Sequence, residues 1–263
     1  MSSPAETKAP GRLAALNPFA SPSPSEREDL ERRAGIREVV FGVQDGILTT
    51  MGLTTGVATA TAGAAVAHTT ILIAGLAGAL AGMVSMGTGA YLAACAERDL
   101  KRAAIHKERG ELQSQPVEEH QEMVDILMDR GVPEAMAQDL TRSLAQYPKL
   151  WEETHIEKEL GISSDPKDSP LRDGLVMATT FLLGAVFPIV PFIVMNGLPA
   201  VAGSLALSAL ALALVGVGKA VVIGQNRLVG GLQVLAVGTA AAVAGYLLGV
   251  VLPHLFGLRL PTT

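Results

Sequence analysis

Residues 174–218 read GLVMATTFLLGAVFPIVPFIVMNGLPAVAGSLALSALALALVGVG and contain no charged side chain. A helix needs about 20 consecutive apolar residues to cross the hydrocarbon core of a bilayer, so this stretch is long enough for two spans. Turn-forming residues stand near its middle, at Asn196-Gly197-Leu198-Pro199, and we expect the chain to reverse there. The stretch therefore predicts a helical membrane protein rather than a soluble domain.

Three further stretches extend this pattern. Residues 69–95 and 228–253 also carry no charge, and residues 39–67 are apolar apart from Asp45. The chain as a whole is 49% hydrophobic and only 4% aromatic, with a mean hydropathy of +0.38. Long runs of small apolar residues are typical of helices that pack tightly in lipid. We predict five spans, at about residues 38–64, 69–95, 172–196, 199–221 and 229–253.

The predicted fold class is an all-α membrane protein with five transmembrane helices and a cytoplasmic helical insert between the second and third. The insert, residues 96–171, is rich in Lys, Arg and Glu. Helix starts are indicated at Pro116 and Pro133, and helix ends at Gly131 and Gly161. The other segments are a disordered, Pro/Ser-rich tail (1–30), spans one and two (31–95), spans three to five (172–254) and a C-terminal tail (255–263).

Basic residues fall on one side of the predicted spans. They precede span one, fill the insert and recur after span four, whereas the loops after spans one and three carry none. Because cytoplasmic loops are enriched in Lys and Arg, we place the N-terminus and the insert in the cytoplasm. No organelle address is visible, which favours a bacterial inner membrane, or a vacuolar membrane if the protein is eukaryotic.

The first span contains an unusual carboxylate. A charge at membrane depth costs about 2.5–3.5 kcal/mol on insertion scales, so Asp45 is a candidate cation or proton site. The alternative is a structural hydrogen bond with Thr49 or with a neighbouring helix. The hydroxyl of Thr49 is itself a candidate for lining a polar path, although it could also bond back to the carbonyl group four residues earlier. Met83 and Met86 share one face of span two and offer thioether ligands for softer metals, although core packing explains such a pair as well. Gly52-x-x-x-Gly56 permits close approach of another helix, for example from a second copy.

The insert holds a second set of acids. Glu108 and Glu111 are three residues apart, and so are Glu119 and Glu122, so each pair shares a helix face. A break at residues 114–116 lets the two helices fold back, which brings four carboxylates within reach of one another. Carboxylates with an occasional His bind hard or borderline divalent ions. Nearby candidates are His120, His155, Glu157 and Glu159. A solvated acidic face is the alternative explanation of the same spacing.

Motifs of enzymes and nucleotide-binding proteins are missing from the sequence. G-x-S-x-G, Walker A, G-x-G-x-x-G and H-E-x-x-H do not occur. A carboxylate-bridged di-iron site would need two Glu-x-x-His motifs, and Glu152-x-x-His155 is the only one. One cysteine, Cys95, cannot build a Cys-based metal site within one chain. We predict no enzyme activity, no tightly bound cofactor and no nucleic-acid partner, and any transport would be driven by gradients.

Three ordered motifs resemble signatures of the vacuolar iron transporter family. Residues 37–46 (REVVFGVQDG) are similar to its opening signature. Residues 84–92 (VSMGTGAYL), with Glu97-Arg98-Asp99, resemble its second-span signature, and residues 181–192 (FLLGAVFPIVPF) its third. The similarity covers about residues 34–254.

This resemblance implies a homodimer in the lipid bilayer that moves Fe²⁺, and often Mn²⁺ or related ions such as Zn²⁺ and Co²⁺, out of the cytosol in exchange for protons. The path would follow the dimer interface. Pathway roles are implied for Glu38, Asp45 and Met86. Metal ligation in the insert is implied for Glu108, Glu111, Glu119, Glu122 and Glu159, with Glu157 as a neighbouring alternative.

The sequence departs from the family pattern at two positions. Ala90 stands where many members have Glu, and His155 where Met is common. Since imidazole also binds Fe²⁺ and Zn²⁺, the second change bears on metal selectivity. Two functions remain open at this point. One is a proton-coupled exporter, in which protonation of the acids weakens metal binding. The other is a non-transporting membrane sensor that uses the acidic insert.

Overall fold

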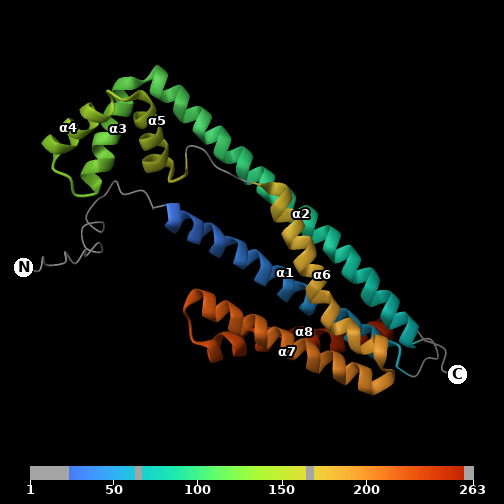
Figure 1. Ribbon diagram of the computed structural model, residues 1–263. Coiled ribbons are helices and arrows are strands. Elements are labelled where there is room, and N and C mark those ends of the chain that lie inside the picture. The colour runs from blue at the N-terminus through green and yellow to red at the C-terminus, as the bar shows by residue number, and fades with distance from the viewer. Residues whose placement is uncertain (1–23, 63–66, 164–168, 258–263) are drawn as a thin grey trace, which may run out of the picture. The chain divides into compact units, whose positions relative to one another are not determined.

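The computed structural model describes residues 24–62, 67–163 and 169–257, and all regular structure in these ranges is helical (Figure 1). The long helices are α1 (Pro24–Ala60), α2 (Ala67–Ser114), α6 (Pro170–Val194), α7 (Gly197–Ile223) and α8 (Arg227–Leu255). Shorter helices lie between α2 and α6: α3 (Pro116–Asp129), α4 (Glu134–Leu144), α5 (Pro148–His155) and the π-helix η2 (Ile156–Leu160).

Four helices, α2, α6, α7 and α8, are long and apolar enough to cross a membrane. They confirm an all-α protein with several membrane spans. Helices α6 and α7 begin and end within two residues of the predicted spans, and the turn between them is confined to Met195 and Asn196. Helix α1 covers residues 38–60 of the predicted first span (38–64), whose last two residues lie outside the described part of the chain. This helix is not among the four in the described residues, so a fifth span stays a prediction.

The chain divides into two compact units. Within the described ranges, the bundle unit comprises residues 30–62, 67–95 and 169–257, and the insert unit comprises residues 24–29 and 96–163. Helix α2 begins in the bundle unit and ends in the insert unit. Most of the predicted N-terminal tail, residues 1–23, lies outside the described residues, and α1 begins directly after it at Pro24.

Glycine backbones bring α1 and α6 of the bundle unit into direct contact. A Cβ atom on Gly46 of α1 would overlap the carbonyl oxygen of Phe181 in α6, and one on Gly184 of α6 would overlap the carbonyl oxygen of Val43. Lipid tails are as apolar as the side chains, so helix association in a bilayer depends on such close packing rather than on the hydrophobic effect. Both glycines are therefore required by the space available.

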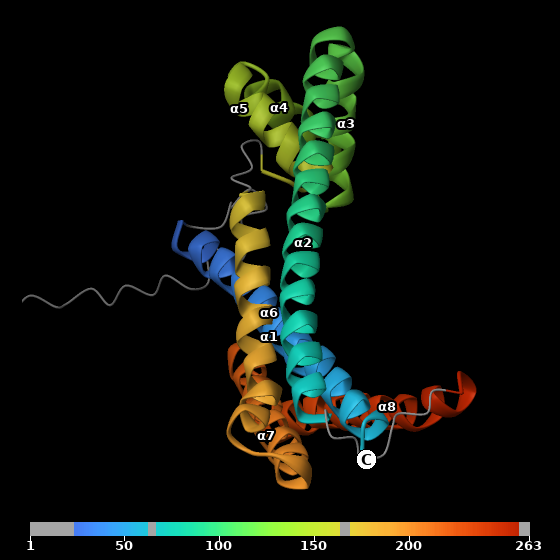
Figure 2. The same ribbon diagram turned by 90° about the vertical axis from the view of Figure 1, so that its right-hand side faces the viewer.

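The Gly52-x-x-x-Gly56 face of α1 is covered by α8 of the same chain. A Cβ on Gly56 would lie 3.0 Å from the carbonyl oxygen of Gly245, and one on Gly249 would overlap the carbonyl oxygen of Gly56. Figure 2 shows α8 beside the C-terminal end of α1. Another helix does approach here, as the motif suggests, but it is intramolecular, so this face is not free for a second copy.

Apolar side chains fill the remaining space in the bundle unit. Ile47 and Met51 of α1 are buried against Leu212 of α7 and Val234 of α8. A second buried cluster surrounds Phe181, with residues from α2 and α6. The first cluster holds α1 inside the unit along the C-terminal half of this helix, and the second joins α2 to α6.

The insert unit has a small core of its own, built around α3. Met123, Val124 and Leu127 are buried against Ala137 of α4, and Trp151 of α5 packs on this cluster. Figures 1 and 2 show α3, α4 and α5 gathered beside the last turns of α2. Helix ends follow the sequence signals, since Gly131 and Gly161 adopt the left-handed conformation with φ of 86° and 66°.

The contact between α1 and α6 can be tested with Gly46→Ala. The new methyl group would overlap the backbone of Phe181, and overpacking of this kind costs about 1–3 kcal/mol. We expect a lower unfolding temperature in detergent. Gly89→Ala in α2 is the matched control, because nothing lies within 4 Å of its added Cβ, and it should be neutral or slightly stabilising. Equal unfolding temperatures for both variants would contradict the packing.

Candidate metal centre

Four side chains of the insert unit converge on one point. Glu108, Glu119, His155 and Glu159 each offer one ligand atom, and these atoms all lie within 4.8 Å of one another. The Nδ1 atom of His155 is 3.1 Å from Oε1 of Glu108 and 3.6 Å from Oε2 of both Glu119 and Glu159. We call these four residues the acid–imidazole group. His155, Glu108 and Glu119 are buried, while Glu159 lies at the open side.

The tautomer of His155 follows from its second nitrogen. Nε2 lies 3.0 Å from the backbone carbonyl oxygen of Glu119, and a carbonyl can only accept a hydrogen bond. Nε2 therefore carries the proton in the neutral ring, and Nδ1 presents its lone pair to the three carboxyl groups. The imidazole is thus oriented as a potential metal ligand.

Three carboxyl groups in this small volume repel one another. Burial raises the pKa of Glu108 to about 8, and Glu159 adds to the effect through a hydrogen bond and its charge. Burial also raises the pKa of Glu119, against the opposing influence of His155. In the absence of a cation, protons must supply part of the neutralisation.

One carboxylate oxygen in the group lacks a hydrogen bond. Oε2 of Glu119 is buried and has no hydrogen-bond partner among the described residues. Leaving a buried polar atom unsatisfied costs about 1–3 kcal/mol, and more when it is charged. A divalent cation would satisfy this oxygen and relieve the repulsion, so the donor set fits a metal ion.

Several local features position the group. Pro116 starts α3 immediately after α2, so Glu119 occupies the first turn of α3 beside Glu108. Arg109 of α2 contacts Glu152 of α5 through Nε and Oε1 at 2.6 Å. His155 ends α5, and Glu159 lies four residues on, inside the π-helix η2. Single-turn π-helices occur frequently at functional sites.

The structure brings together part of the predicted acid set. Glu108 and Glu119 meet as predicted, together with His155 and Glu159. Glu111 instead accepts a hydrogen bond from Lys107 at 2.8 Å, and Glu122 is exposed on α3. Glu157 is half-buried in η2 and lies outside the group. His120 is also outside the group, with its ring centroid 6.1 Å from that of Trp151. Ligation by Glu111, Glu122 or Glu157 stays a prediction.

The predicted pathway residues lie in the bundle unit. Asp45 is half-buried on α1 within hydrogen-bonding reach of Thr49, which was the structural alternative for this carboxylate. Met83 and Met86 of α2 are partly buried against the Phe181 cluster. Glu38 lies half-buried on α1. The two methionines therefore have a packing role, and the pathway roles of all these residues stay predictions.

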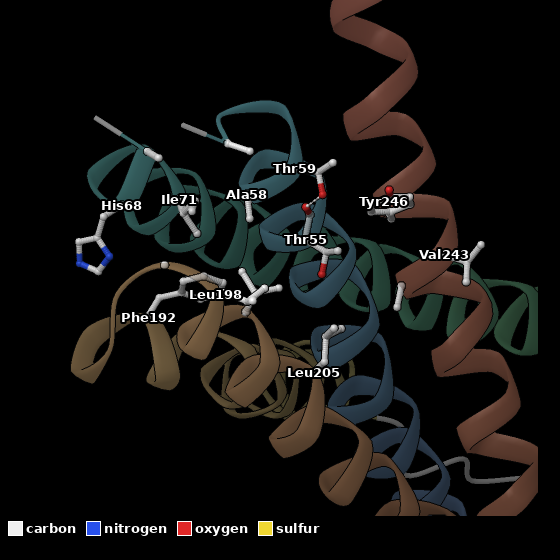
Figure 3. Close-up of a pocket in the computed structure, with 15 residues that line it drawn as sticks. Thr55, Ala58, Thr59, His68, Ile71, Phe192, Leu198, Leu205, Val243 and Tyr246 are labelled. Atoms are coloured by element: carbon white, nitrogen blue, oxygen red, sulfur yellow. Dashed lines mark hydrogen bonds between the residues drawn. The ribbon is translucent and has the colours of Figure 1, made fainter. Parts of the chain in front are cut away.

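A cavity of about 660 Å³ lies in the bundle unit between α1, α2, α7 and α8 (Figure 3). Its lining is mainly apolar, and the polar side chains are those of Thr55, Thr59, His68 and Tyr246. The hydroxyl of Thr59 donates to the carbonyl oxygen of Thr55 at 2.8 Å. With one imidazole and no carboxylate, this lining does not suit a divalent ion. Asp45, Met83 and Met86 do not line it.

Sequence reasoning missed the aromatic support of the group. Trp151 packs edge-on against His155, with ring centroids 4.7 Å apart and an interplanar angle of 69°. The ring centroid of Trp151 also lies 6.1 Å from that of His120. The spacing of Trp151 and His155, four residues apart on one short helix, was the available signal.

The described residues contain four helices that are long and apolar enough to cross a membrane, and a charged insert in which four potential metal-ligand side chains converge. These features define a multi-pass membrane protein with a candidate metal centre. Over residues 36–250 the sequence matches the VIT family, and the chain belongs to this family.

Curated relatives agree with this assignment. The chain is 27% identical to vacuolar iron transporter 1 of Arabidopsis thaliana over 220 residues, which cover 83% of this chain and 86% of the relative. It is 30% identical to vacuolar iron transporter 1 of Tulipa gesneriana, over 80% of this chain and 84% of the relative. It is 34% identical to the vacuolar iron transporter of Toxoplasma gondii, over 60% of this chain and 52% of the relative. These names are those of transporters, in agreement with the prediction that the chain is not an enzyme.

The protonation of Glu108 gives a pH dependence in the metal-free protein. Its folded-state pKa is about 8, above the ordinary value of 4.5, so the folded state binds this proton more tightly than the unfolded state does. The resulting stabilisation is complete below about pH 4.5 and is lost as the pH rises through 8. We expect the unfolding temperature of the chelator-treated protein to fall over this range, and Glu108→Gln to flatten the fall.

The exposed Glu122 supplies the control, because Glu122→Gln should leave the pH profile unchanged. Added divalent metal should restore stability most strongly near pH 8, where it replaces the lost proton. A profile that is the same in the unmodified protein and in Glu108→Gln would contradict the assignment.

Proposed function

We propose that this protein transports divalent transition metals across a membrane, with Fe²⁺ as the first candidate and Mn²⁺ or related ions as others. The observation that carries the proposal is the acid–imidazole group, whose buried Glu119 oxygen lacks a hydrogen bond. The names of the relatives, vacuolar iron transporters, support iron as the cargo. In this proposal the insert collects metal in the cytosol and the bundle unit carries it out.

Proton exchange is the proposed driving force. The raised pKa of Glu108, caused mainly by burial, means that a proton competes with metal near neutral pH. Metal ligands must be deprotonated to bind, so each metal ion captured by the group would release protons. Such competition supports coupling between the two ions, and the sequence contains no nucleotide motif that would supply another energy source.

We propose a homodimer, in which the outer face of α1 forms the interface. In this proposal α1 also crosses the membrane, in addition to α2, α6, α7 and α8. Phe41, Asp45, Thr49 and Leu53 recur every four residues and so lie on one face. Phe41 and Leu53 are 54% and 37% exposed, Thr49 is exposed, and Asp45 is half-buried. Toward lipid this carboxylate would cost about 2.5–3.5 kcal/mol. A second copy that covers the face would remove the cost and enclose Asp45 in a path.

Cross-linking tests the dimer. In a Cys95→Ser background, Thr49→Cys should yield a cross-linked dimer with a short bis-maleimide, because the two copies of this residue would face each other. Leu210→Cys on α7, which is 58% exposed, is the matched control and should remain monomeric on a denaturing gel. Cross-linking of Leu210→Cys but not of Thr49→Cys would place the interface elsewhere.

Flux through Asp45 tests the path. Asp45→Asn should lower Fe²⁺ uptake into proteoliposomes about tenfold or more, since loss of even an outer partner of a metal ligand costs about 10- to 100-fold. Asp125→Asn, an exposed acid on α3 outside the acid–imidazole group, is the control. Unchanged flux in Asp45→Asn would exclude the proposed path.

The second candidate function is a non-transporting metal sensor, which the acid–imidazole group would serve equally. Inside-out vesicles with an imposed pH gradient separate the two functions when Fe²⁺, Mn²⁺, Co²⁺ and Zn²⁺ are compared. Uptake that follows the gradient supports a proton-coupled exporter. Metal binding without uptake of any ion would favour the sensor.

A further inference from the structure

A nitrogen ligand stands among the three carboxyl groups of the metal centre. His155 is fully buried, and its Nδ1 faces oxygen atoms of Glu108, Glu119 and Glu159 at 3.1, 3.6 and 3.6 Å. The alternative nitrogen, Nε2, is committed to the carbonyl oxygen of Glu119. The imidazole therefore cannot flip without losing this hydrogen bond. Leaving the buried carbonyl group without its partner would cost about 1–3 kcal/mol.

Trp151 restricts the ring further. Its ring packs edge-on against the imidazole, with 4.7 Å between the ring centroids, and this contact limits how far the imidazole can tilt. Trp151 in turn packs on the Met123–Leu127 core of α3 and approaches His120. The orientation of Nδ1 is thus set by a backbone carbonyl group and an aromatic ring that do not themselves bind metal.

The geometry suits one small ion. Metal–ligand bonds of about 2.1 Å to nitrogen and oxygen allow ligand atoms to be at most about 4.2 Å apart around one centre. The four ligand atoms lie within 4.8 Å of one another, so the most distant pair would have to approach by at least about 0.6 Å for all four to bind a single ion. Four protein ligands also leave little room for the waters that Mg²⁺ keeps.

From this geometry we propose that His155 is the specificity-determining residue of the centre. It makes the site select Fe²⁺, Co²⁺ and Zn²⁺ over Mn²⁺, Mg²⁺ and Ca²⁺, and Trp151 is the positioning residue that holds it. Imidazole suits Fe and Zn, whereas an all-carboxylate site suits Mn, Mg and Ca. The inference rests on metal binding by the insert, as in the proposed function, but it does not require transport.

Binding competition with the full-length protein in detergent tests the selectivity. His155→Gln replaces the nitrogen ligand with an amide and should weaken Zn²⁺ and Co²⁺ binding about tenfold or more, while Mn²⁺ affinity changes less than about threefold. His120→Gln is the matched control, because this second imidazole near Trp151 is outside the acid–imidazole group. Equal losses for all three metals in His155→Gln would overturn the proposal.

A measurement on the unmodified protein guards against a variant that fails to fold. With ¹⁵N-labelled histidine, Zn²⁺ should shift the Nδ1 resonance of His155 and leave Nε2 protonated. A metal-dependent shift at Nε2, or none at either nitrogen while Zn²⁺ is bound, would overturn the proposal.

The role of Trp151 is tested by its own pair of variants. Trp151→Ala should weaken Zn²⁺ binding and spare Mn²⁺, and Trp151→Phe, which keeps an aromatic edge, should rescue it. Equal effects on both metals would indicate a structural role only.

These outcomes remain separate from those of the transport test. Selective binding without flux would remove the exporter and keep the specificity role. Normal flux with unselective metal binding in the unmodified protein would keep the exporter and remove the specificity role of His155.

Discussion

The high cost of a charge in hydrocarbon is the constraint that organises this chain. It explains why α2, α6, α7 and α8 carry long uncharged stretches and why charged residues are concentrated in the insert, which includes the C-terminal part of α2. The two compact units follow this division. Asp45 is the exception on α1, and a carboxylate in such a place requires either a polar partner or a wet path.

The two units are stabilised by different physical means. In the bundle unit, glycines such as Gly46 and Gly184 let backbones touch, which lipid favours because side-chain burial gains little there. In the insert unit, Met123 and Leu127 form an ordinary apolar core in contact with water-exposed helices. The acid–imidazole group lies in the same small unit. The cost of burying its carboxyl groups must therefore be offset by the apolar packing of only a few helices.

Much of the fold could be predicted from the sequence, because uncharged stretches mark spans and Pro and Gly mark helix ends. Pro116, Gly131 and Gly161 all lie at helix boundaries. The partner of the Gly52-x-x-x-Gly56 face could not be predicted, because a glycine motif permits close approach without specifying the helix. It proved to be α8 of the same chain.

The sequence predicts an acidic metal-binding site in the insert, but it does not predict which of the acidic residues form the site. Residues three apart on a helix differ in direction by about 60°, so Glu108 and Glu111 share a face, yet only tertiary packing decides which of them turns inward. Glu108 is buried, whereas Glu111 pairs with Lys107. The position of Glu159 depends on the π-helix η2, whose wider turn has no signature that spacing rules for α-helices detect.

Trp151 also makes the candidate metal centre accessible to fluorescence measurements. It is the sole tryptophan of the chain, and its indole ring touches the imidazole of His155. Excitation at the red edge of the protein absorption band therefore reports from a single place, beside the proposed metal centre. A paramagnetic ion such as Fe²⁺ or Co²⁺ held there would quench this emission, and diamagnetic Zn²⁺ would not do so by the same route. The protein thus contains an intrinsic optical probe of its own occupancy, without any attached label.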